Sequence, residues 1–394
     1  MKKLFFIAAI AGAALVSCTK NELAPSATEQ HEINFAGPVT QVVTKADLVP
    51  ATYPEGTNFA VYAHHHFKNY ASETNFTSYM RGNDNKGVVV TNNGATEGKR
   101  NDTFELDDKT FDNYWKPVTK YYWPMEGYLT FAAYSPDTAS EFVKGYSITN
   151  GVTMSYTTPD VGKQYDLMLS DRAVDQVRTS MVENVKDQDV TTAYDGVHIA
   201  FKHVLSAVSF AVKTAEDYLG AGTDAGGYKI TLKSLTLKNA YSTGTLTQFA
   251  KKEETAVNLN TVWSDVTTEN TTGYAVCPED VTLSTSAKTW AGEGDADLVM
   301  IPQNLNHSET SKVVAEIVYT VYHKDMGEEK NAITYTKSLP LATTNVAAWA
   351  PSTRYLYTII IGMEEIVFAP TVTNWADPTP IEIPESTVIP TPTV

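Results

Sequence analysis

The histidine cluster His64, His65 and His66 is the first candidate for metal chemistry in this sequence. In a strand, His64 and His66 share one face and could together bind a metal ion weakly. Specific metal sites need three or four ligands, and no Cys, Asp or Glu lies at ligand spacing nearby. We therefore predict no metal site here and interpret the cluster as a solvated strand end.

Two loops match ligand-binding motifs only in part. Residues 220–227 (GAGTDAGG) have Ala225 where a dinucleotide-binding loop requires glycine, so we expect a hairpin loop there. Residues 295–297 (DAD) open like a calcium loop, but Val299 occupies the next ligand position and the required glycine is missing. The sequence contains neither a G-x-S-x-G nor an H-E-x-x-H motif. We therefore predict no catalytic residues, no cofactor and no enzymatic activity.

Cys18 and Cys277 are the only cysteines among the 394 residues. Cys277 lies in the strand-like run 273–278 (GYAVCP), where a free cysteine behaves as a small apolar residue. We expect its thiol to be buried and unpaired, and we expect a fold that needs no disulfide.

Cys18 follows a stretch that is typical of a secretory signal. Lys2 and Lys3 precede an almost entirely apolar run over residues 4–16, and small residues lead into the cysteine. The run is too short to cross a membrane, which needs roughly 20 apolar residues. Ser17 followed by Cys18 resembles a bacterial lipoprotein signal. This resemblance implies cleavage before Cys18, lipid on its thiol and attachment to a membrane outside the cytoplasm, whereas the alternative is an ordinary secretory signal with a chance cysteine.

The composition is acidic. Lysine and arginine number 30 against 46 aspartate and glutamate residues, which gives a formal net charge of −16. Binding of nucleic acid requires clustered basic residues that neutralise phosphate, so we predict no nucleic-acid partner. The length suffices for two or three domains of roughly 150 residues each.

Most of the sequence predicts β-strands. Runs rich in Val, Ile, Thr, Tyr and Phe alternate with clusters of Gly, Asn, Asp and Pro. The clearest runs span residues 58–63, 129–134, 229–237, 313–322 and 355–361. In the third of these, Ile230 and Leu232 point to one face and the lysines to the other. Residues 173–190 could instead form a helical turn or a loop. Many short strands with turn punctuation predict an all-β fold built of sandwiches.

We divide the chain into five parts. A signal peptide (1–17) and a polar tether (18–31) precede an N-terminal β-sandwich domain (32–192), a C-terminal β-sandwich domain (193–375) and an extended tail (376–394). The tail contains five prolines, which remove ladder donors and favour extended geometry. One interpretation of the tail is disorder. Its apolar residues favour the other, which is that the extended tail binds a partner.

Ten stretches, taken together and in order, resemble the fimbrillin family of Bacteroidales bacteria, the subunits of lipoprotein-derived fimbriae. They are 32–35 (EINF), 44–46 (TKA), 56–63 (GTNFAVYA), 122–124 (YWP), 129–136 (LTFAAYSP), 165–168 (YDLM), 201–210 (FKHVLSAVSF), 301–303 (IPQ), 355–362 (YLYTIIIG) and Trp375. Their order spans nearly the whole mature chain.

This resemblance implies two tandem transthyretin-like Greek-key β-sandwich domains. It also implies export as a lipoprotein to the outer membrane, proteolytic removal of an N-terminal segment, and polymerisation by strand exchange with other fimbrial subunits. Loss of a strand such as residues 33–43 would leave a groove whose unpaired N–H and C=O groups attract an extended segment of the next subunit. Such a contact does not close on itself and propagates a filament. The alternative is that residues 33–43 form a permanent first strand.

The resemblance assigns proteolytic processing to Lys45 and Ala46. Cleavage in the family commonly follows a basic residue, usually arginine, near the start of the first domain, and Lys45 stands at the matching position. A lysine there implies either a protease that accepts lysine or a subunit that keeps its first strand and its lipid, as an anchor subunit would.

The tail is the candidate donor strand, with Ile381, Ile383, Val388 and Ile389 as the expected contacts. Each proline in it costs a ladder hydrogen bond unless that position faces away from the partner strand. The predicted function is a structural subunit of a surface fimbria, which supports adhesion to host or bacterial surface ligands. The alternative is a surface glycan-binding lipoprotein of a nutrient-uptake system, which exposed Trp or Tyr platforms would favour.

Overall fold

A computed structural model describes the chain in stretches, and all structural statements refer to these. They are residues 32–35, 38–41, 50–54, 56–92, 115–177, 196–219, 227–249, 258–277, 279–290, 297–362, 365–374, 377–382 and 387–390. Within them the regular structure is β-strand, so the prediction of an all-β fold is confirmed. The helices among these residues are short 3-10 turns: Tyr70–Ser72, Asn83–Asn85, Asp137–Glu141, Val161–Lys163, Lys324–Met326 and Glu329–Asn331.

Ten strands, most of them from the N-terminal half, form the first sheet. They are β1 (Val39–Gln41), β2 (Pro50–Thr52), β3 (Phe59–His66), β4 (Thr77–Met80), β5 (Val88–Asn92), β6 (Trp115–Pro117), β7 (Tyr128–Ser135), β10 (Met168–Ser170), β11 (Ala173–Gln176) and β12 (Ala200–His203). The order is β2-β1-β12-β10-β7-β3-β5-β6, with β11 beside β7 and β4 beside β3. One face carries a core that includes Phe59, Phe131 and Phe201. A helical turn or a loop was expected from residue 173 onward, and β11 shows that this was wrong for residues 173–176.

A four-stranded sheet covers the other face of β3 and β7. Its strands are β8 (Val143–Ser147), β9 (Gly151–Thr157), β15 (Tyr241–Thr247) and β16 (Val262–Glu269), in the order β16-β15-β9-β8. Tyr62 and Tyr134 of the first sheet share a buried core with Met154, Tyr156 and Leu246 of this one. We call these two sheets the first sandwich, although β15 and β16 come from the C-terminal half of the chain.

A second sandwich follows, built from a seven-stranded and a five-stranded sheet. The strands of the larger sheet are β13 (Ser206–Thr214), β19 (Lys288–Trp290), β20 (Leu298–Met300), β23 (Thr353–Ile361), β24 (Glu365–Asn374), β25 (Asp377–Glu382) and β26 (Thr387–Pro390). Their order is β19-β13-β23-β24-β25, with β20 beside β13 and β26 beside β24. The strands of the smaller sheet are β14 (Tyr228–Lys238), β17 (Tyr274–Cys277), β18 (Val281–Thr282), β21 (Val314–His323) and β22 (Ile333–Pro340). Their order is β17-β14-β21-β22, with β18 beside β14.

The core of the second sandwich confirms two predictions. Ile230 and Leu232 on β14 are both buried, as their alternation with lysines predicts. Cys277 is buried and free, and its thiol donates to the Glu279 carbonyl at 3.3 Å. Burial raises the pKa of this thiol, which therefore stays protonated and unreactive at neutral pH.

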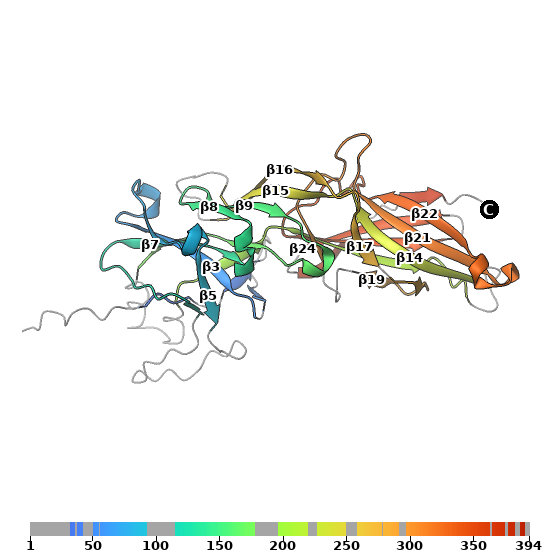
Figure 1. The fold of residues 1–394 in the computed structure, drawn as a ribbon, viewed down its shortest axis with the longest axis horizontal. Helices are drawn as coiled ribbons and strands as arrows, with labels where there is room; N and C mark the ends of the chain where they lie inside the picture. The colour runs from blue at the N-terminus through green and yellow to red at the C-terminus, as the bar shows by residue number, and fades with distance from the viewer. Residues whose placement is uncertain are drawn as a thin grey trace, which may run out of the picture.

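The two sandwiches lie one after the other along an elongated molecule, with β3 and β7 toward one end and β14 and β21 toward the other (Figure 1). The predicted domain boundary at residues 192–193 lies outside the described residues and stays a prediction. Beyond it, β12 pairs within the first sheet, whereas β13 belongs to the second sandwich.

The loop around residues 220–226 also lies outside the described residues. The strands that flank it, β13 and β14, belong to different sheets. The expectation of a hairpin loop was therefore wrong, because the chain here crosses from one layer of the second sandwich to the other.

Candidate assembly site

Residues 32–35 pair as a strand with the chain that begins at β6. The Ile33 N–H donates to the Tyr121 carbonyl at 2.8 Å, and the Phe35 N–H donates to the Trp115 carbonyl at 2.9 Å. The Trp115 N–H donates back to the Phe35 carbonyl at 3.3 Å, and the two chains run antiparallel. This short segment is thus fixed along one side by backbone hydrogen bonds.

The other side of the segment pairs with the chain that leads into β12. The Val197 N–H donates to the Asn34 carbonyl at 2.9 Å, and here the two chains run parallel. Further on, β1 continues this parallel pairing with β12. Because β6 is one end of the first sheet, the segment joins this end to the chain that leads into β12. The strands from β12 to β6 are thereby closed into a ring, and β2 stays outside it, paired with β1.

The side chains of the segment complete the core inside this ring. Phe35 is 0% exposed and Ile33 is 1% exposed. The Phe35 ring stands edge-on to Phe59 and Phe131, with ring centroids 5.6 and 5.7 Å apart. Burial of one such side chain is worth about 1.5–3 kcal/mol. Removal of the segment would therefore leave a hole in the core and two unpaired strand edges.

The predicted processing site follows this segment in the chain. Lys45 and Ala46 lie outside the described residues, in the stretch 42–49 that connects β1 and β2. Those strands are antiparallel neighbours of only three residues each. The predicted lipidation site Cys18 also lies outside the described residues, as do the signal peptide and the tether.

The candidate donor strand pairs within its own chain. The β25 and β26 strands of the tail lie antiparallel along β24, on the edge opposite β23. Ile381 lies opposite Val372. Val388 and Ile389 lie opposite Val367 and Ile366 in the same way. The fourth predicted contact, Ile383, lies outside the described residues.

The histidine cluster is not the solvated strand end that the sequence predicts. His66 is 0% exposed, and its ring nitrogens lie 2.6 Å from the Lys68 carbonyl and 2.8 Å from Thr130 Oγ1. His64 is half-buried and stacks on Tyr146. Within the described residues, no group of three or more Cys, His, Asp or Glu side chains could hold a metal ion.

Acid is expected to destabilise the first sandwich through His64. Burial lowers the pKa of His64 from 6.5 to about 4. The unfolded chain therefore binds the proton more readily, so stability is complete above about pH 6.5 and falls as the pH drops toward 4. Because His64 is partly exposed, we expect this protonation to lower the free energy of unfolding by at most about 3 kcal/mol. Urea unfolding at pH 7 and pH 4.5 measures it. The variant His64→Phe should flatten this pH dependence, whereas His198→Gln at an exposed position should not; an equal slope in both variants would contradict the assignment.

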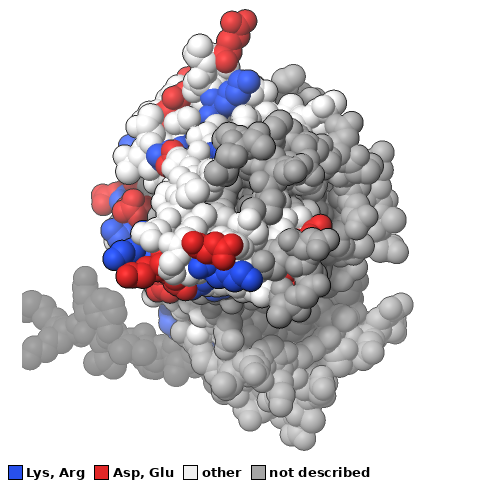
Figure 2. Space-filling model, turned by 90° about the vertical axis from the view of Figure 1, so that its right-hand side faces the viewer, with Lys and Arg blue, Asp and Glu red and all other residues white. Residues whose placement is uncertain are grey.

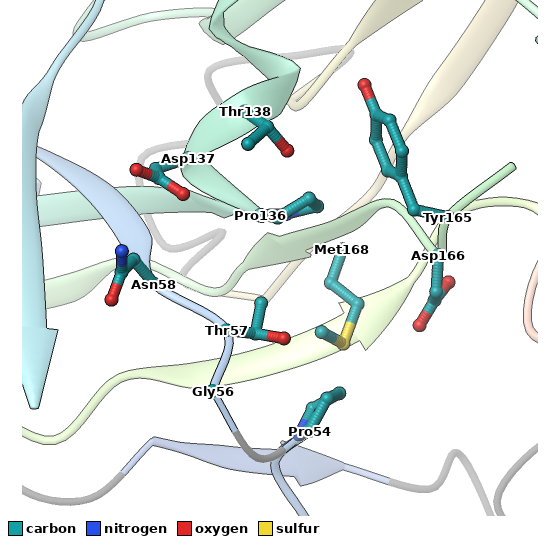
Figure 3. A pocket seen from close by; sticks show the side chains of 10 residues that line it. All are labelled: Pro54, Gly56, Thr57, Asn58, Pro136, Asp137, Thr138, Tyr165, Asp166 and Met168. Carbon is teal, nitrogen blue, oxygen red and sulfur yellow. The ribbon is translucent and has the colours of Figure 1, made fainter. Parts of the chain in front are cut away.

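A cavity of about 440 Å³ opens where β3 and β10 begin and β7 ends (Figure 3). Asp137 and Asp166 stand on opposite sides of it in this view, with Met168 between them. His203 Nδ1 lies 2.6 Å from Asp166 Oδ2, whereas Oδ1 is buried and has no hydrogen-bond partner among the described residues. Two carboxyl-bearing residues, Asp137 and Asp166, thus line this cavity.

The surface gives little support to glycan binding. The exposed large apolar side chains in the described stretches are Phe67, Val118, Met125, Leu219, Val262 and Ile333. This set includes no Trp or Tyr, which are the platforms that glycan binding would favour. On the end face toward which β14 and β21 extend, basic and acidic side chains lie side by side (Figure 2). The described helices include none long and apolar enough to cross a membrane.

A comparison with known protein families identifies the family of this chain. A family model described as fimbrillin-like matches residues 53–375. The chain belongs to the fimbrillin-like family. Fimbrillins are structural, non-enzymatic proteins, so the prediction that this chain is not an enzyme is confirmed on that ground. Membership also assigns this fimbrillin to the cell-surface fimbria, as a subunit that assembles with other fimbrial subunits.

Solved structures that match this chain include two fimbrial proteins. A fimbrial protein from Bacteroides vulgatus is 18% identical, with 87% of this chain and 99% of that chain covered and a TM-score of 0.48. The tip fimbrial protein Mfa3 from Porphyromonas gingivalis, with a C-terminal truncation, is 9% identical, with 81% and 94% covered and a TM-score of 0.35. No curated protein matches this fimbrillin. Since both TM-scores are below 0.5, the family assignment rests on the sequence match.

Sequence reasoning identified the N-terminal segment of this fimbrillin but missed the two strands that hold it. Trp115 and Val197 lie far from Phe35 in the sequence, and no local pattern connects the three positions.

Proposed function

We propose that this fimbrillin is exported as a lipoprotein and is first held at the outer membrane by lipid on Cys18. The basic start, the short apolar run and the small residues before Cys18 support this proposal. The polar stretch 19–31 would then separate the first sandwich from the membrane surface.

We further propose that the subunit assembles by proteolysis-triggered strand exchange. The closure of the first sheet by residues 32–35 supports this proposal most strongly, because one short segment fills both a core position and a gap between two strand edges. A cut after Lys45 would separate this segment covalently from β2 and the remainder of the sandwich. Its hydrogen bonds and the buried Phe35 would still hold it in place, so release would need a competing strand.

The tail has the pattern of such a competitor. Ile381 and Ile383 alternate around a polar residue as Ile33 and Phe35 do, which suits a strand that is buried on one face. A tail that is paired with β24 cannot donate at the same time. When a tail enters the groove of another subunit, its pairing with β24 of its own chain would be replaced by pairing with strands of that subunit. In the monomer, the tail would stay paired with β24 until such a groove opens.

A lysine-specific protease provides the test. Brief digestion of residues 19–394 is expected to cut first after Lys45, which lies between two strands of only three residues. A ladder of stable oligomers should follow, because each opened groove accepts the tail of another subunit. Intact mass and size-exclusion chromatography measure the cut and the ladder.

The variant Lys45→Ala is the matched control and should stay monomeric under the same digestion. Cutting at Lys45 without oligomers would contradict assembly from this subunit alone and would point to a tip subunit or a second subunit type. Resistance at Lys45 would contradict the processing site and favour an anchor that keeps its first strand and its lipid.

The alternative function as a glycan-binding lipoprotein has only the cavity of Figure 3 in its favour. We infer instead that any host or bacterial surface ligand would be bound by the assembled fimbria. Among the described residues, the exposed large apolar side chains include no Trp or Tyr.

A further inference from the structure

The β15–β16 hairpin crosses from one sandwich to the other. It leaves the second sandwich at the end of β14 and returns to it at the start of β17. Between these points β15 pairs with β9, from Thr243 opposite Thr157 to Thr247 opposite Thr153. The hairpin therefore belongs to the second sandwich by chain connection and to the first sandwich by strand pairing.

The root of the hairpin is clamped by Gln303 of the second sandwich. Gln303 Oε1 accepts the Tyr241 N–H at 2.7 Å, and Gln303 Nε2 donates to the Tyr241 carbonyl at 3.1 Å and to the Ile301 carbonyl at 3.0 Å. One side chain thus satisfies both backbone groups of the first residue of β15, as a neighbouring strand would. Gln303 is only 7% exposed, so water cannot readily replace these hydrogen bonds.

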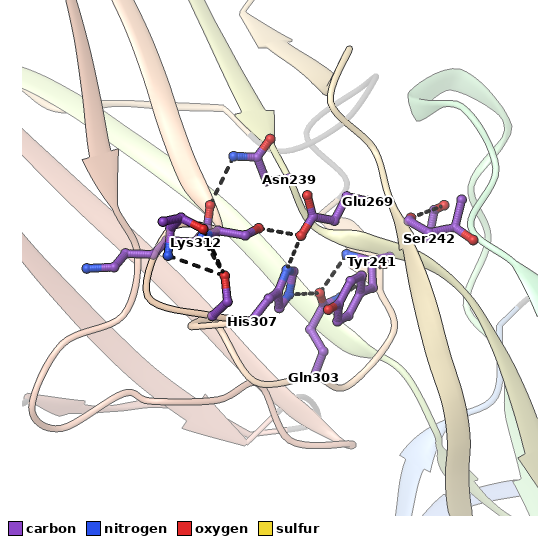
Figure 4. A network of polar contacts seen from close by, with 11 residues as sticks. Asn239, Tyr241, Ser242, Glu269, Gln303, His307 and Lys312 are labelled. Atoms are coloured by element: carbon purple, nitrogen blue, oxygen red, sulfur yellow. Dashed lines mark hydrogen bonds and ion pairs between the residues drawn. The ribbon is translucent and has the colours of Figure 1, made fainter.

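His307 completes the clamp from the same loop (Figure 4). Its ring stacks on the Tyr241 ring with centroids 3.6 Å apart and planes 9° apart. Its Nδ1 lies 3.2 Å from Glu269 Oε1, and its Nε2 lies 3.2 Å from Gln303 Oε1. Glu269 pairs directly across from Tyr241 at the other root of the hairpin, so His307 contacts both strands at once. Its side chain is only 2% exposed.

The far end of β15 is fixed just as firmly in the first sandwich. Gln248 is fully buried, with Oε1 accepting the Val152 N–H at 2.9 Å and Nε2 donating to the Ser170 carbonyl at 2.8 Å. The guanidinium of Arg172 lies 3.4 Å from the centroid of the buried Phe249 ring. These contacts tie the end of β15 to β9 and β10.

The hairpin also holds the covalent connection between the sandwiches. Trp263 on β16 donates from its indole N–H to the Val204 carbonyl at 2.9 Å, and Val204 lies between β12 and β13. Domains that are joined by a single crossing of the chain generally move relative to each other. A hairpin fixed at both ends and along the connection removes that freedom.

We propose that the β15–β16 hairpin is a strut that sets the angle between the two sandwiches, with Gln303 and His307 as the clamp that keeps it rigid. Substitution of Gln303 or His307 removes no apolar side chain from the hydrophobic clusters of the two sandwiches. The strut acts within one monomer, so it does not depend on strand exchange or on cleavage after Lys45.

The test measures the distance between the sandwiches in the monomer. Nitroxide labels at Thr77→Cys and Thr334→Cys report it by double electron–electron resonance. The protein comprises residues 19–394 with Cys277→Ala, so that Cys18 and Cys277 are both absent and only the two introduced thiols react. Both labelled positions are exposed, one on β4 and one on β22. The parent should give one narrow distance distribution. The variant Gln303→Ala should widen that distribution at least twofold while the circular dichroism spectrum stays unchanged.

A second variant keeps the proposal testable if Gln303→Ala does not fold. His307→Phe retains an aromatic ring on Tyr241 but loses both polar contacts, and it should also widen the distribution. Gln176→Ala is the matched control, because the Gln176 amide bonds to the Val174 carbonyl within the first sandwich, and its distribution should stay narrow. An unchanged width in the folded clamp variants would overturn the proposal.

Discussion

The variant Phe35→Ala is expected to lower the free energy of unfolding of the first sandwich by about 3–5 kcal/mol. Phe35 is fully buried and packs edge-on against two other phenylalanine rings, so truncation leaves a cavity that its neighbours cannot fill. Urea unfolding of residues 19–394, followed by tryptophan fluorescence, measures the loss. The loss should be confined to the first sandwich, because Phe35 contributes to the core inside the first sheet and not to that of the second sandwich.

Glu32→Ala is the matched control for this experiment. The Glu32 carboxylate forms an ion pair with the exposed Lys120, and exposed pairs contribute little to stability. A loss below about 1 kcal/mol in Phe35→Ala would mean that residues 32–35 lie on the sandwich without supporting it. In that case their removal would open no groove, and the strand-exchange proposal would lose its structural basis.

Local alternation predicted a strand such as β14 well because only one of its faces is buried. On β14, the positions Ile230 and Leu232 are buried, and so are Leu235 and Leu237. The second pair is one residue out of phase with the first, which requires a β-bulge between them. The pairing with β21 shifts register between Leu232 and Ser234, as this break in the pattern requires.

Pairing between distant segments could not be predicted in the same way. The residues of β9 that pair with β15 lie 86 to 94 positions earlier in the chain, from Thr157 opposite Thr243 to Thr153 opposite Thr247. Alternation fixes which face of a strand is buried but does not identify the strand beside it. The domain division by sequence could therefore place the C-terminal half as one unit, but it could not show that a hairpin from this half completes the first sandwich.

Burial of polar side chains was also hard to predict. The sequence suggested a solvated end for the histidine run, yet His66 is fully buried because the Thr130 hydroxyl and the Lys68 carbonyl satisfy its ring nitrogens. A buried polar side chain needs such partners. Thr130 comes from the neighbouring strand β7, so the sequence around residue 66 contained no sign of it.

Ending the chain at Ala376 is expected to abolish polymer formation and leave a folded monomer. The truncation removes β25 and β26, which hold three of the four predicted donor contacts. The strand β24 should stay in place because it pairs with β23 along its other edge, from Thr353 opposite Asn374 to Ile361 opposite Ile366. Circular dichroism measures the fold, and electron microscopy after lysine-specific digestion measures the polymers.

A chain that ends at Pro390 is the matched control, because it keeps all four predicted contacts and should still polymerise. The shorter chain still has its N-terminal groove, so it can accept a tail but cannot donate one. Mixed with the full chain before digestion, it should stop growth at one end and shorten the polymers in proportion to its share. Polymers that persist in the pure truncated chain would rule out the tail as donor. Polymers of unchanged length in the mixture would show that the groove of the first sandwich is not the acceptor.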